Sequence, residues 1–307
     1  MYDAIIVGAG PAGVSASIWL KQLGFNPMAI DKQSQCGGLQ LANPYTNTWI
    51  ATSANAFGPD VAQAMHQNML RHEVPMHLGV TASRAHVAHD GVSVELSNGE
   101  QFRAQFLVLA GGVTPKTGGH ASRLGLIVGP GPSVANTNFD QARVAILGGG
   151  DSAFENYGFA KSRGAREITI FARSIKARAE MLSRVPPHDV VLGDYDLDSV
   201  ANTVNGSPFD QILVLYGYEA SKSSLLGLDL AMRPDGFVST DGDTLTSNPK
   251  VFAIGELAGR WHPCCATAMA DGVVAAKAIQ RKLEVTAAQK FTGFVRRAAK
   301  LGSSVLA

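Results

Sequence analysis

The sequence predicts an α/β protein with two Rossmann-like nucleotide-binding domains. Two observations carry this prediction: a glycine-rich loop joins a strand to a helix at residues 8–13, and a second such loop lies at residues 148–153. The length of 307 residues agrees with two domains. With 46% hydrophobic and 17% charged residues, the chain has enough apolar material for two cores and too little charge for disorder.

Composition and charge exclude several classes of protein. The formal net charge of +1 provides no long-range field to collect nucleic acid or an anionic membrane. Three cysteines are too few for a secreted disulfide framework, and they fit reduced thiols or one redox pair and a spare. An apolar strand begins by residue 4 with no basic segment before it, and no apolar run reaches bilayer length. We therefore expect a cytoplasmic protein with no signal peptide, no transmembrane segment and no nucleic-acid partner.

The first glycine loop has the spacing of a dinucleotide site. An apolar strand over residues 4–7 runs into Gly8, Gly10 and Gly13, and a helical pattern follows. These glycines permit a tight turn, close approach of the backbone to a pyrophosphate, and close helix–strand packing. The next strand ends at Asp31, about 20 residues on, where a carboxylate binds ribose hydroxyls. We predict dinucleotide binding here, and an ordinary glycine-rich turn is the alternative.

The second glycine loop predicts a different nucleotide. The strand over residues 144–147 leads to Gly148, Gly150 and Ala153, the G-x-G-x-x-A variant. The strand that follows ends at Arg173 with no acid, which favours a 2′-phosphate and hence NADP over NAD. Arg178 would add to this charge, unless these arginines are only solvated surface cations.

The domain boundaries follow from the turns between the two loops. The run "FLVLAGGVTP" ends in glycines and Pro115, where the chain can leave one domain. Later turns and a strand around residues 233–256 bring the chain back toward the first domain. We expect a first domain of residues 1–114 and 245–307, with residues 115–244 inserted as the second.

Six motifs together carry a family resemblance. They are "VGAGPAG" at 6–12, "CGGLQ" at 36–40, "FGPDVAQAM" at 57–65, "LAGGVTP" at 109–115, "GGGDSAFE" at 148–155 and "VFAIGELAG" at 251–259. Over nearly its whole length, the chain resembles the low-molecular-weight thioredoxin reductase group of two-domain flavoproteins. The resemblance implies a thioredoxin reductase-like, three-layer ββα fold. It also implies FAD in a discontinuous first domain, NADP(H) in the inserted domain, and a homodimer.

Carried over by position, the resemblance implies two sets of cofactor-binding residues. Those for FAD are Gly8, Gly10, Pro11, Ala12, Gly13, Asp31, Lys32, Gly37, Gly38, Leu39, Gln40, Asn47, Ala110, Gly111, Gly112, Gly255, Glu256, Pro263 and Ala266. Those for the second nucleotide are Gly148, Gly150, Asp151, Ser152, Ala153, Arg173 and Arg178. Glu256 stands where the family has an aspartate that binds the ribityl chain. Cys264 stands where the family has a glutamine whose backbone N–H faces the flavin.

The chain departs from the family at the redox centre. Thioredoxin reductases carry a Cys-x-x-Cys shortly before the second glycine loop, but here residues 135–138 read Ala-Asn-Thr-Asn. The three cysteines lie elsewhere, at Cys36, Cys264 and Cys265. Since the resemblance places all three around one flavin, we interpret them as a relocated redox disulfide, Cys36 with Cys264 or Cys265. A strained Cys264–Cys265 bridge and simple packing of small apolar side chains are the alternatives.

The neighbours of these cysteines suggest supporting roles. The N-terminus of the last helix is expected to lower the pKa of the Cys264 and Cys265 thiols. His262 is a candidate proton donor or acceptor for the thiol chemistry. Four aromatic residues are candidate neighbours of the flavin, with ordinary packing as the alternative: Trp49, Trp261, Phe291 and Phe294.

Three functions remain open from the sequence. The first is an FAD-dependent disulfide/dithiol oxidoreductase with a thiol/disulfide protein or small molecule as partner; it includes a cyanobacterial diflavin-linked branch with a second FAD in place of the nicotinamide nucleotide. The second is a ferredoxin– or flavodoxin–NADP reductase, which has no redox disulfide and takes a ferredoxin-type partner. The third is a nucleotide-binding scaffold without turnover. No metal site is predicted.

Overall fold

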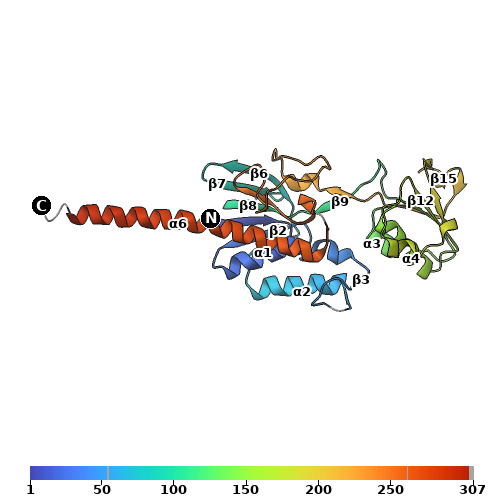
Figure 1. Ribbon diagram of the computed structural model, residues 1–307, viewed down its shortest axis with the longest axis horizontal. Coiled ribbons are helices and arrows are strands. Elements are labelled where there is room, and N and C mark those ends of the chain that lie inside the picture. The colour runs from blue at the N-terminus through green and yellow to red at the C-terminus, as the bar shows by residue number, and fades with distance from the viewer. Residues whose placement is uncertain (54, 261, 304–307) are drawn as a thin grey trace. The chain divides into compact units, whose positions relative to one another are not determined.

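The computed structural model describes residues 1–53, 55–260 and 262–303, without the side chains of residues 132, 286–287 and 289–303. Its contacts divide the chain into two units (Figure 1). Unit 1 consists of Met1–Leu41, Thr46–Gly112 and Ala220–Ala307, and unit 2 of Ala42–Tyr45 and Val113–Glu219. The first unit is thus discontinuous in sequence, as expected for a domain that holds an insertion.

Unit 1 is built on a seven-stranded sheet in the order β5-β2-β1-β8-β7-β6, with β19 also paired to β8. The strands are β1 (Tyr2–Val7), β2 (Pro27–Asp31), β5 (Met76–Leu78), β6 (Ala82–Ala88), β7 (Gly91–Leu96), β8 (Gln101–Leu109) and β19 (Val251–Ala253). Strands β5, β2, β1, β8 and β19 run parallel, whereas β6 and β7 are antiparallel to their neighbours. The carboxyl ends of the parallel strands therefore meet at one edge.

Both faces of β1 are covered. Ala4 and Ile6 pack into a cluster with α1 (Pro11–Gln22) and α6 (Cys265–Ser303), which lie along one face of the sheet (Figure 1). Ile5 and Val7 pack on the other face, against β6, β7 and residues that follow Ala220. This alternation gives three layers, and it explains why β1 reads as a continuous apolar run.

The helices of unit 1 approach one another closely. A Cβ at Gly272 of α6 would lie 2.4 Å from the backbone oxygen of Ala12 in α1, so only glycine fits at this crossing. Pro11 begins α1, where its missing N–H costs no hydrogen bond. The remaining elements of the unit are η1 (Gly38–Ala42), β3 (Thr46–Asn47), β4 (Ala56–Phe57), α2 (Gly58–Arg71), η3 (Lys222–Leu225) and η4 (Gly255–Ala258).

Unit 2 has a parallel sheet of its own, in the order β10-β17-β11-β12-β13. Its strands are β10 (Leu126–Val128), β11 (Arg143–Leu147), β12 (Glu167–Ala172), β13 (Val190–Leu192) and β17 (Gln211–Val214). Helix α4 (Asp151–Ser162) covers β11 and β12 with Phe154, Tyr157 and Ala160. The unit is completed by α3 (Pro132–Ala135), α5 (Ala179–Leu182), η2 (Pro187–Asp189), the ribbon β14 (Leu197–Asp198), β15 (Thr203–Val204) and β16 (Ser207–Pro208), and the pair β9 (Val113–Pro115) and β18 (Tyr218–Ala220).

The second boundary differs from the sequence prediction. The insertion was expected to extend to residue 244, but contacts assign the chain to unit 1 again from Ala220. The reason is packing: the Ser221 N–H donates to the Gly112 carbonyl at 3.1 Å, and Leu226 and Val238 are buried in the core of unit 1. Turn-rich sequence between residues 220 and 244 concealed this return.

Among the described residues, none of the helices combines the length and the apolar character that a bilayer span requires.

Candidate functional site

The first glycine loop is held against the ends of two parallel strands. The Gly8 N–H donates to the Ile30 carbonyl at 2.8 Å, and the Ala9 N–H donates to Oδ2 of Asp31 at 2.5 Å. Gly8 has φ +107°, and a Cβ there would lie 2.3 Å from the Ala110 oxygen. The loop therefore needs glycine at residue 8, and it places the carboxylate that ends β2 directly beside the N-terminus of α1.

A second segment, Gly37 and Gly38, follows β2 in the sequence and packs against this loop. The Gly37 N–H donates to the Ala9 carbonyl at 2.8 Å. A Cβ on Gly38 (φ +56°) would lie only 2.9 Å from Cα of Gly10, and one on Gly37 would lie 2.3 Å from Cβ of Ala62. The structure thus brings together the two glycine segments that the sequence prediction assigned to one cofactor.

The turn after β19 is the third wall. Gly255 has φ +67°, and a Cβ there would lie 3.0 Å from Cβ of Ala12. Its N–H donates to Oδ2 of Asp271 at 3.0 Å, and Arg260 pairs with the same buried carboxylate at 2.7 Å. Sequence reasoning missed Arg260 and Asp271. The available signal was that Asp271 is the one acid in the apolar helical run 265–279.

These walls fit a flavin dinucleotide. At Gly10 an added Cβ would meet only Gly38, at 3.6 Å. The cradle of glycines therefore has room for a pyrophosphate at this position. The N–H groups at the start of α1 favour an anion, and Asp31 supplies an acceptor for ribose hydroxyls. Glu256 is half-buried, and burial raises the pKa of its carboxyl.

The other predicted FAD residues take varied positions. Asn47 is buried and donates to Oε1 of Gln40 at 2.9 Å, which ties η1 to β3. A Cβ at Gly111 would collide with Ser224, and Gly112 has φ +66°. Lys32 and Leu39 are exposed, with Leu39 at 49%. All of these residues belong to unit 1.

The cysteines come together in part. All three are free thiols, with Cys36 fully buried and Cys264 and Cys265 half-buried. Cys36 belongs to a cluster with Ala9, Val14 and Met65, and Cys265 packs against that same cluster. The Cys36 Sγ lies 3.6 Å from Sδ of Met76. The structure therefore places the two thiols on one hydrophobic cluster beside the glycine cradle.

One expectation about these thiols is wrong. The N-terminus of the last helix was expected to lower the pKa of Cys265, but burial, together with Cys264 and Glu256, raises that pKa to about 11. Burial and the nearby Asp31 raise the pKa of Cys36 to about 11 as well. At Cys265, desolvation of the thiolate outweighs the helix dipole because the side chain packs against an apolar cluster.

Cys264 precedes α6 and interacts with its first turn. Its Sγ accepts from the Thr267 N–H at 3.5 Å and lies 3.4 Å from Oγ1 of Thr267. The same hydroxyl donates to the His262 carbonyl at 2.8 Å. The side chains of His262 and Pro263 are exposed, and Ala266 is exposed within the first turn.

Of the four aromatic candidates, only Trp49 has a described side chain. Trp49 is 74% exposed and is therefore not a core residue. Trp261 lies outside the described residues, as do the side chains of Phe291 and Phe294.

The second glycine loop lies in unit 2 and repeats the first. Gly148 (φ +148°) donates to the Phe171 carbonyl at 2.9 Å, and a Cβ there would lie 2.2 Å from the Leu215 oxygen. A Cβ at Gly150 would meet no atom within 4 Å, so the start of α4 is open. Ala153 is fully buried, and the Ser152 carbonyl accepts from Asn156 at 2.7 Å.

The two predicted arginines differ in their engagement. Arg178 donates from its backbone N–H and from Nε to Asp151, at 2.8 and 2.6 Å. Arg173, which follows β12, is exposed, pairs with exposed Asp194 at 3.5 Å and lies over the Tyr195 ring, with Cζ 5.7 Å from the ring centroid. The contacts of Arg178 with Asp151 are thus shorter than the contact of Arg173 with Asp194.

Comparison with known proteins agrees with this geometry. No protein-family model matches the chain. It is 27% identical over 315 residues to a bifunctional thioredoxin reductase/thioredoxin of Mycobacterium leprae, covering 94% of this chain and 68% of that protein. It is 25% identical over 288 residues to a ferredoxin–NADP reductase of Ignicoccus hospitalis, covering 84% and 90%. The crystal structure of Lactococcus lactis thioredoxin reductase superposes with a TM-score of 0.78 at 18% identity, covering 92% and 98%.

The chain has a thioredoxin reductase-like fold with parallel sheets in both units, which confirms the predicted fold class. In sequence as in fold, the chain is similar to thioredoxin reductases, which are flavin-dependent oxidoreductases. Thioredoxin reductases use FAD and NADPH, which agrees with the cofactors that the sequence resemblance implies.

Proposed function

We propose that this protein is an FAD-dependent disulfide oxidoreductase whose redox thiols are Cys36 and Cys265. One observation carries the proposal: these thiols, distant in sequence, pack on one hydrophobic cluster beside the glycine cradle. Cys264 is the one other cysteine in the sequence, so few other pairs of thiols could carry out a dithiol reaction. Cys36 is the pair member adjacent to Gly37 and Gly38, the wall against which the flavin is proposed to lie.

Residues of unit 1 hold the cofactor in this proposal. The backbone from Gly8 to Gly13 receives the pyrophosphate, and Asp31 accepts from ribose hydroxyls. Glu256 accepts from the ribityl chain. Gly37 and Gly38 keep side chains away from the cofactor. Bound there, FAD supplies an acceptor and donor of two electrons.

The thiol reaction with a disulfide substrate balances without a further reagent. The Cys265 thiolate attacks one substrate sulfur, which forms a mixed disulfide and releases one substrate thiol. The Cys36 thiolate then attacks Cys265 Sγ, which releases the second substrate thiol and forms the Cys36–Cys265 bridge. The two cysteine protons end on the two released thiols. Cys265 acts first because it is half-buried, whereas Cys36 is fully buried.

The raised pKa values set the pH behaviour of this step. With both values near 11, few thiolates exist at neutral pH, so exchange is expected to quicken as the pH rises. His262, whose side chain is exposed, is proposed to carry protons for the leaving thiols.

For the second nucleotide, we propose NADP(H) in unit 2. Support comes from the open start of α4 and from exposed Arg173 at the end of β12, where no acid stands. A second FAD at this position, as in the diflavin-linked branch, is the outcome that chromatography of the released nucleotides distinguishes. A homodimer is also proposed, and sedimentation of the holoenzyme tests it.

A thiol count of the oxidised, denatured holoenzyme tests the central proposal. We expect one free thiol in the native sequence, none in Cys264→Ser, and two in Cys36→Ser. Three free thiols in the native protein would contradict the proposal. Disulfide reduction should be lost in Cys36→Ser and Cys265→Ser, while flavin bleaching by NADPH persists.

The same assay separates the competing functions. If disulfide reduction is absent in the native protein and electrons pass from NADPH to a ferredoxin, the protein is an electron transferase like the Ignicoccus relative. If no reducible flavin is bound, the scaffold interpretation holds.

A further inference from the structure

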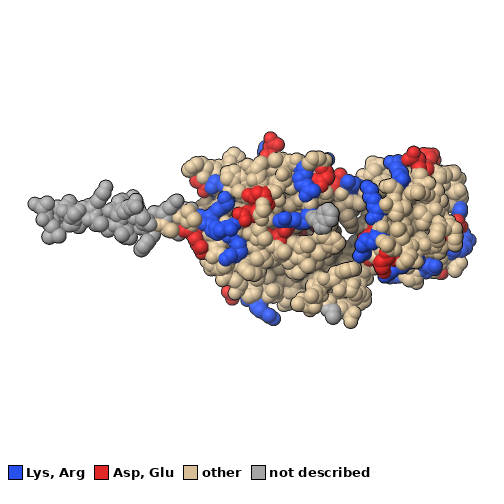
Figure 2. Space-filling view, viewed as in Figure 1, with Lys and Arg blue, Asp and Glu red and all other residues tan. Residues whose placement is uncertain are grey.

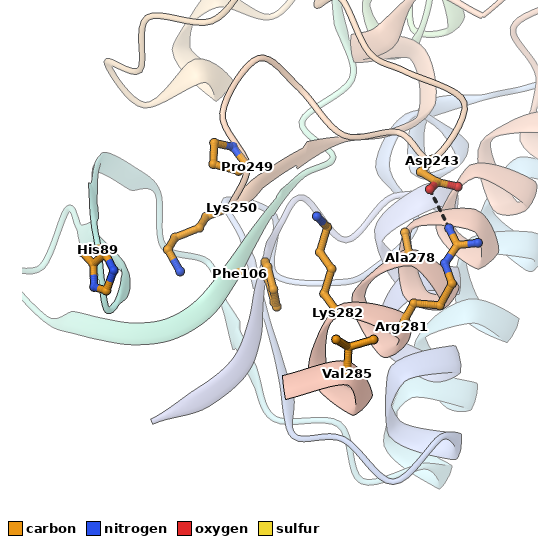
Figure 3. Close-up of a pocket in the computed structure, with 9 residues that line it drawn as sticks. All are labelled: His89, Phe106, Asp243, Pro249, Lys250, Ala278, Arg281, Lys282 and Val285. Atoms are coloured by element: carbon orange, nitrogen blue, oxygen red, sulfur yellow. Dashed lines mark ion pairs between the residues drawn. The ribbon is translucent and has the colours of Figure 1, made fainter. Parts of the chain in front are cut away.

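An open pocket of about 680 Å³ lies on unit 1, apart from the glycine cradle (Figure 3). It is formed by the β6–β7 turn, β8, the segment before β19, and α6. Its lining residues are His89, Phe106, Asp243, Pro249, Lys250, Ala278, Arg281, Lys282 and Val285. Nothing in the proposed redox function uses these residues.

Position in the sheet separates the pocket from the cofactor site. Lys250 directly precedes β19, so it stands at the amino end of that strand. Gly8, Asp31 and Gly255 stand at the carboxyl ends of β1, β2 and β19. Because these strands are parallel, the two sites occupy opposite edges of one sheet.

The pocket is cationic. Lys250 and Lys282 lie on either side of Phe106 (Figure 3), and the Lys250 Nζ lies 5.9 Å from the centroid of the Phe106 ring. Asp243 is the single acid in the lining, and Arg281 already neutralises it at 2.6 Å. The lysines therefore give the pocket a net positive charge that the chain's overall charge of +1 conceals.

The pocket is also apolar between its cations. Phe106, Ala278 and Pro249 contribute carbon surface to the lining, and Val285 at its border is 57% exposed. An open site with cationic groups around an apolar base matches an anionic amphiphile better than a small, fully hydrated anion.

The charge of the adjoining sequence continues this pattern. After Val285, residues 286–307 include Lys290, Arg296, Arg297 and Lys300 and no Asp or Glu. In the described part of unit 1, Figure 2 shows Lys and Arg gathered on the face from which α6 continues. We propose that this face docks on an anionic lipid surface, with a headgroup phosphate between Lys250 and Lys282.

Vesicle binding of the full-length protein tests the proposal. Cosedimentation is measured with phosphatidylglycerol/phosphatidylcholine vesicles, with pure phosphatidylcholine vesicles, and across a salt series. We expect binding to the anionic vesicles alone, weakened by salt. Each Lys→Gln change in the pocket removes about 1 kcal/mol, or roughly fivefold in partition coefficient, so K250Q/K282Q is expected to bind roughly 25-fold more weakly.

A matched control separates the pocket from general charge. Lys277 is exposed on the same helix and lies outside the lining. K277Q should change the partition coefficient less than twofold. Circular dichroism and flavin content confirm that each variant is folded.

Three results would overturn the proposal. Equal binding of K250Q/K282Q and K277Q would mean that the pocket has no special part. No binding to anionic vesicles would exclude a lipid surface. Saturable binding of glycerol phosphate or inorganic phosphate, without vesicle binding, would assign the pocket to a soluble phosphate instead.

Discussion

Asp31 accepts a hydrogen bond from the Ala9 N–H at 2.5 Å, which fixes the end of β2 to the first glycine loop. The same loop accepts from Gly37, so three chain segments are organised around one backbone turn. The FAD proposed for this site would meet all of these groups at once, through its pyrophosphate and its ribose. A change at Gly10, the open position of this turn, should therefore alter cofactor binding before it alters the fold.

Gly10→Ala tests this directly. Gly10 has φ −75°, and an added Cβ would lie 3.6 Å from Gly38 Cα, so the protein itself accommodates alanine. We expect a normal unfolding midpoint and loss of FAD by at least tenfold in affinity, because the methyl group occupies the approach to the pyrophosphate. Flavin absorbance after gel filtration measures this loss.

Gly24→Ala is the matched control. Gly24 has φ +85° and no atom within 4 Å of an added Cβ, so alanine adds backbone strain of about 1 kcal/mol without touching the site. This variant should be less stable yet keep its FAD. Full flavin content in Gly10→Ala would show that no pyrophosphate lies at this loop.

The buried Cys36 thiol should make stability fall at high pH. Its pKa is raised from 9.0 to about 11, so the unfolded chain ionises first. The neutral Cys36 thiol makes its full contribution to the free energy of unfolding below pH 9. As the pH rises to 11, the free energy of unfolding falls by up to about 2.7 kcal/mol. Urea unfolding of the fully reduced native protein and of reduced Cys36→Ala at pH 8 to 11 measures it. The difference between the two should shrink with pH, and a constant difference would refute the raised pKa.

Arg173→Ala should weaken NADPH without affecting NADH. Loss of one charge-assisted contact to a 2′-phosphate costs about 1.5–3 kcal/mol, or roughly 10- to 150-fold in KM. Steady-state flavin reduction with both nucleotides measures the change. Arg166→Ala, another exposed arginine of unit 2, is the control and should leave both KM values alone. An unchanged preference in Arg173→Ala would remove this residue from the site.

Replacement by valine should change the stability of the protein differently at two buried threonines near β19. Thr246 donates to the Val251 carbonyl at 2.8 Å and accepts from the Asn248 N–H at 3.1 Å. Thr244 is fully buried, and its hydroxyl has no partner among the described residues. Thr246→Val should cost about 1–3 kcal/mol, whereas Thr244→Val should be neutral or stabilising. Denaturant unfolding checks both, and equal losses would contradict the assigned hydrogen bonds.

The sequence alone determined the two Rossmann-like folds and their glycine loops. Tight turns and close backbone approaches admit only glycine, so Gly8 and Gly148 are visible without coordinates. The resemblance likewise anticipated that Gly37 and Gly38 would join the first loop. These are local requirements, repeated at fixed spacing along the chain.

Tertiary structure alone decided the remainder. The return of the chain at Ala220, the Arg260–Asp271 pair and the cationic pocket each depend on segments that meet only after the sheet forms. The thiol pKa values reversed the expectation for Cys265, because burial is a property of the packed core and the helix terminus is a property of local sequence. Long-range packing sets solvation, and no spacing of residues along the chain records it.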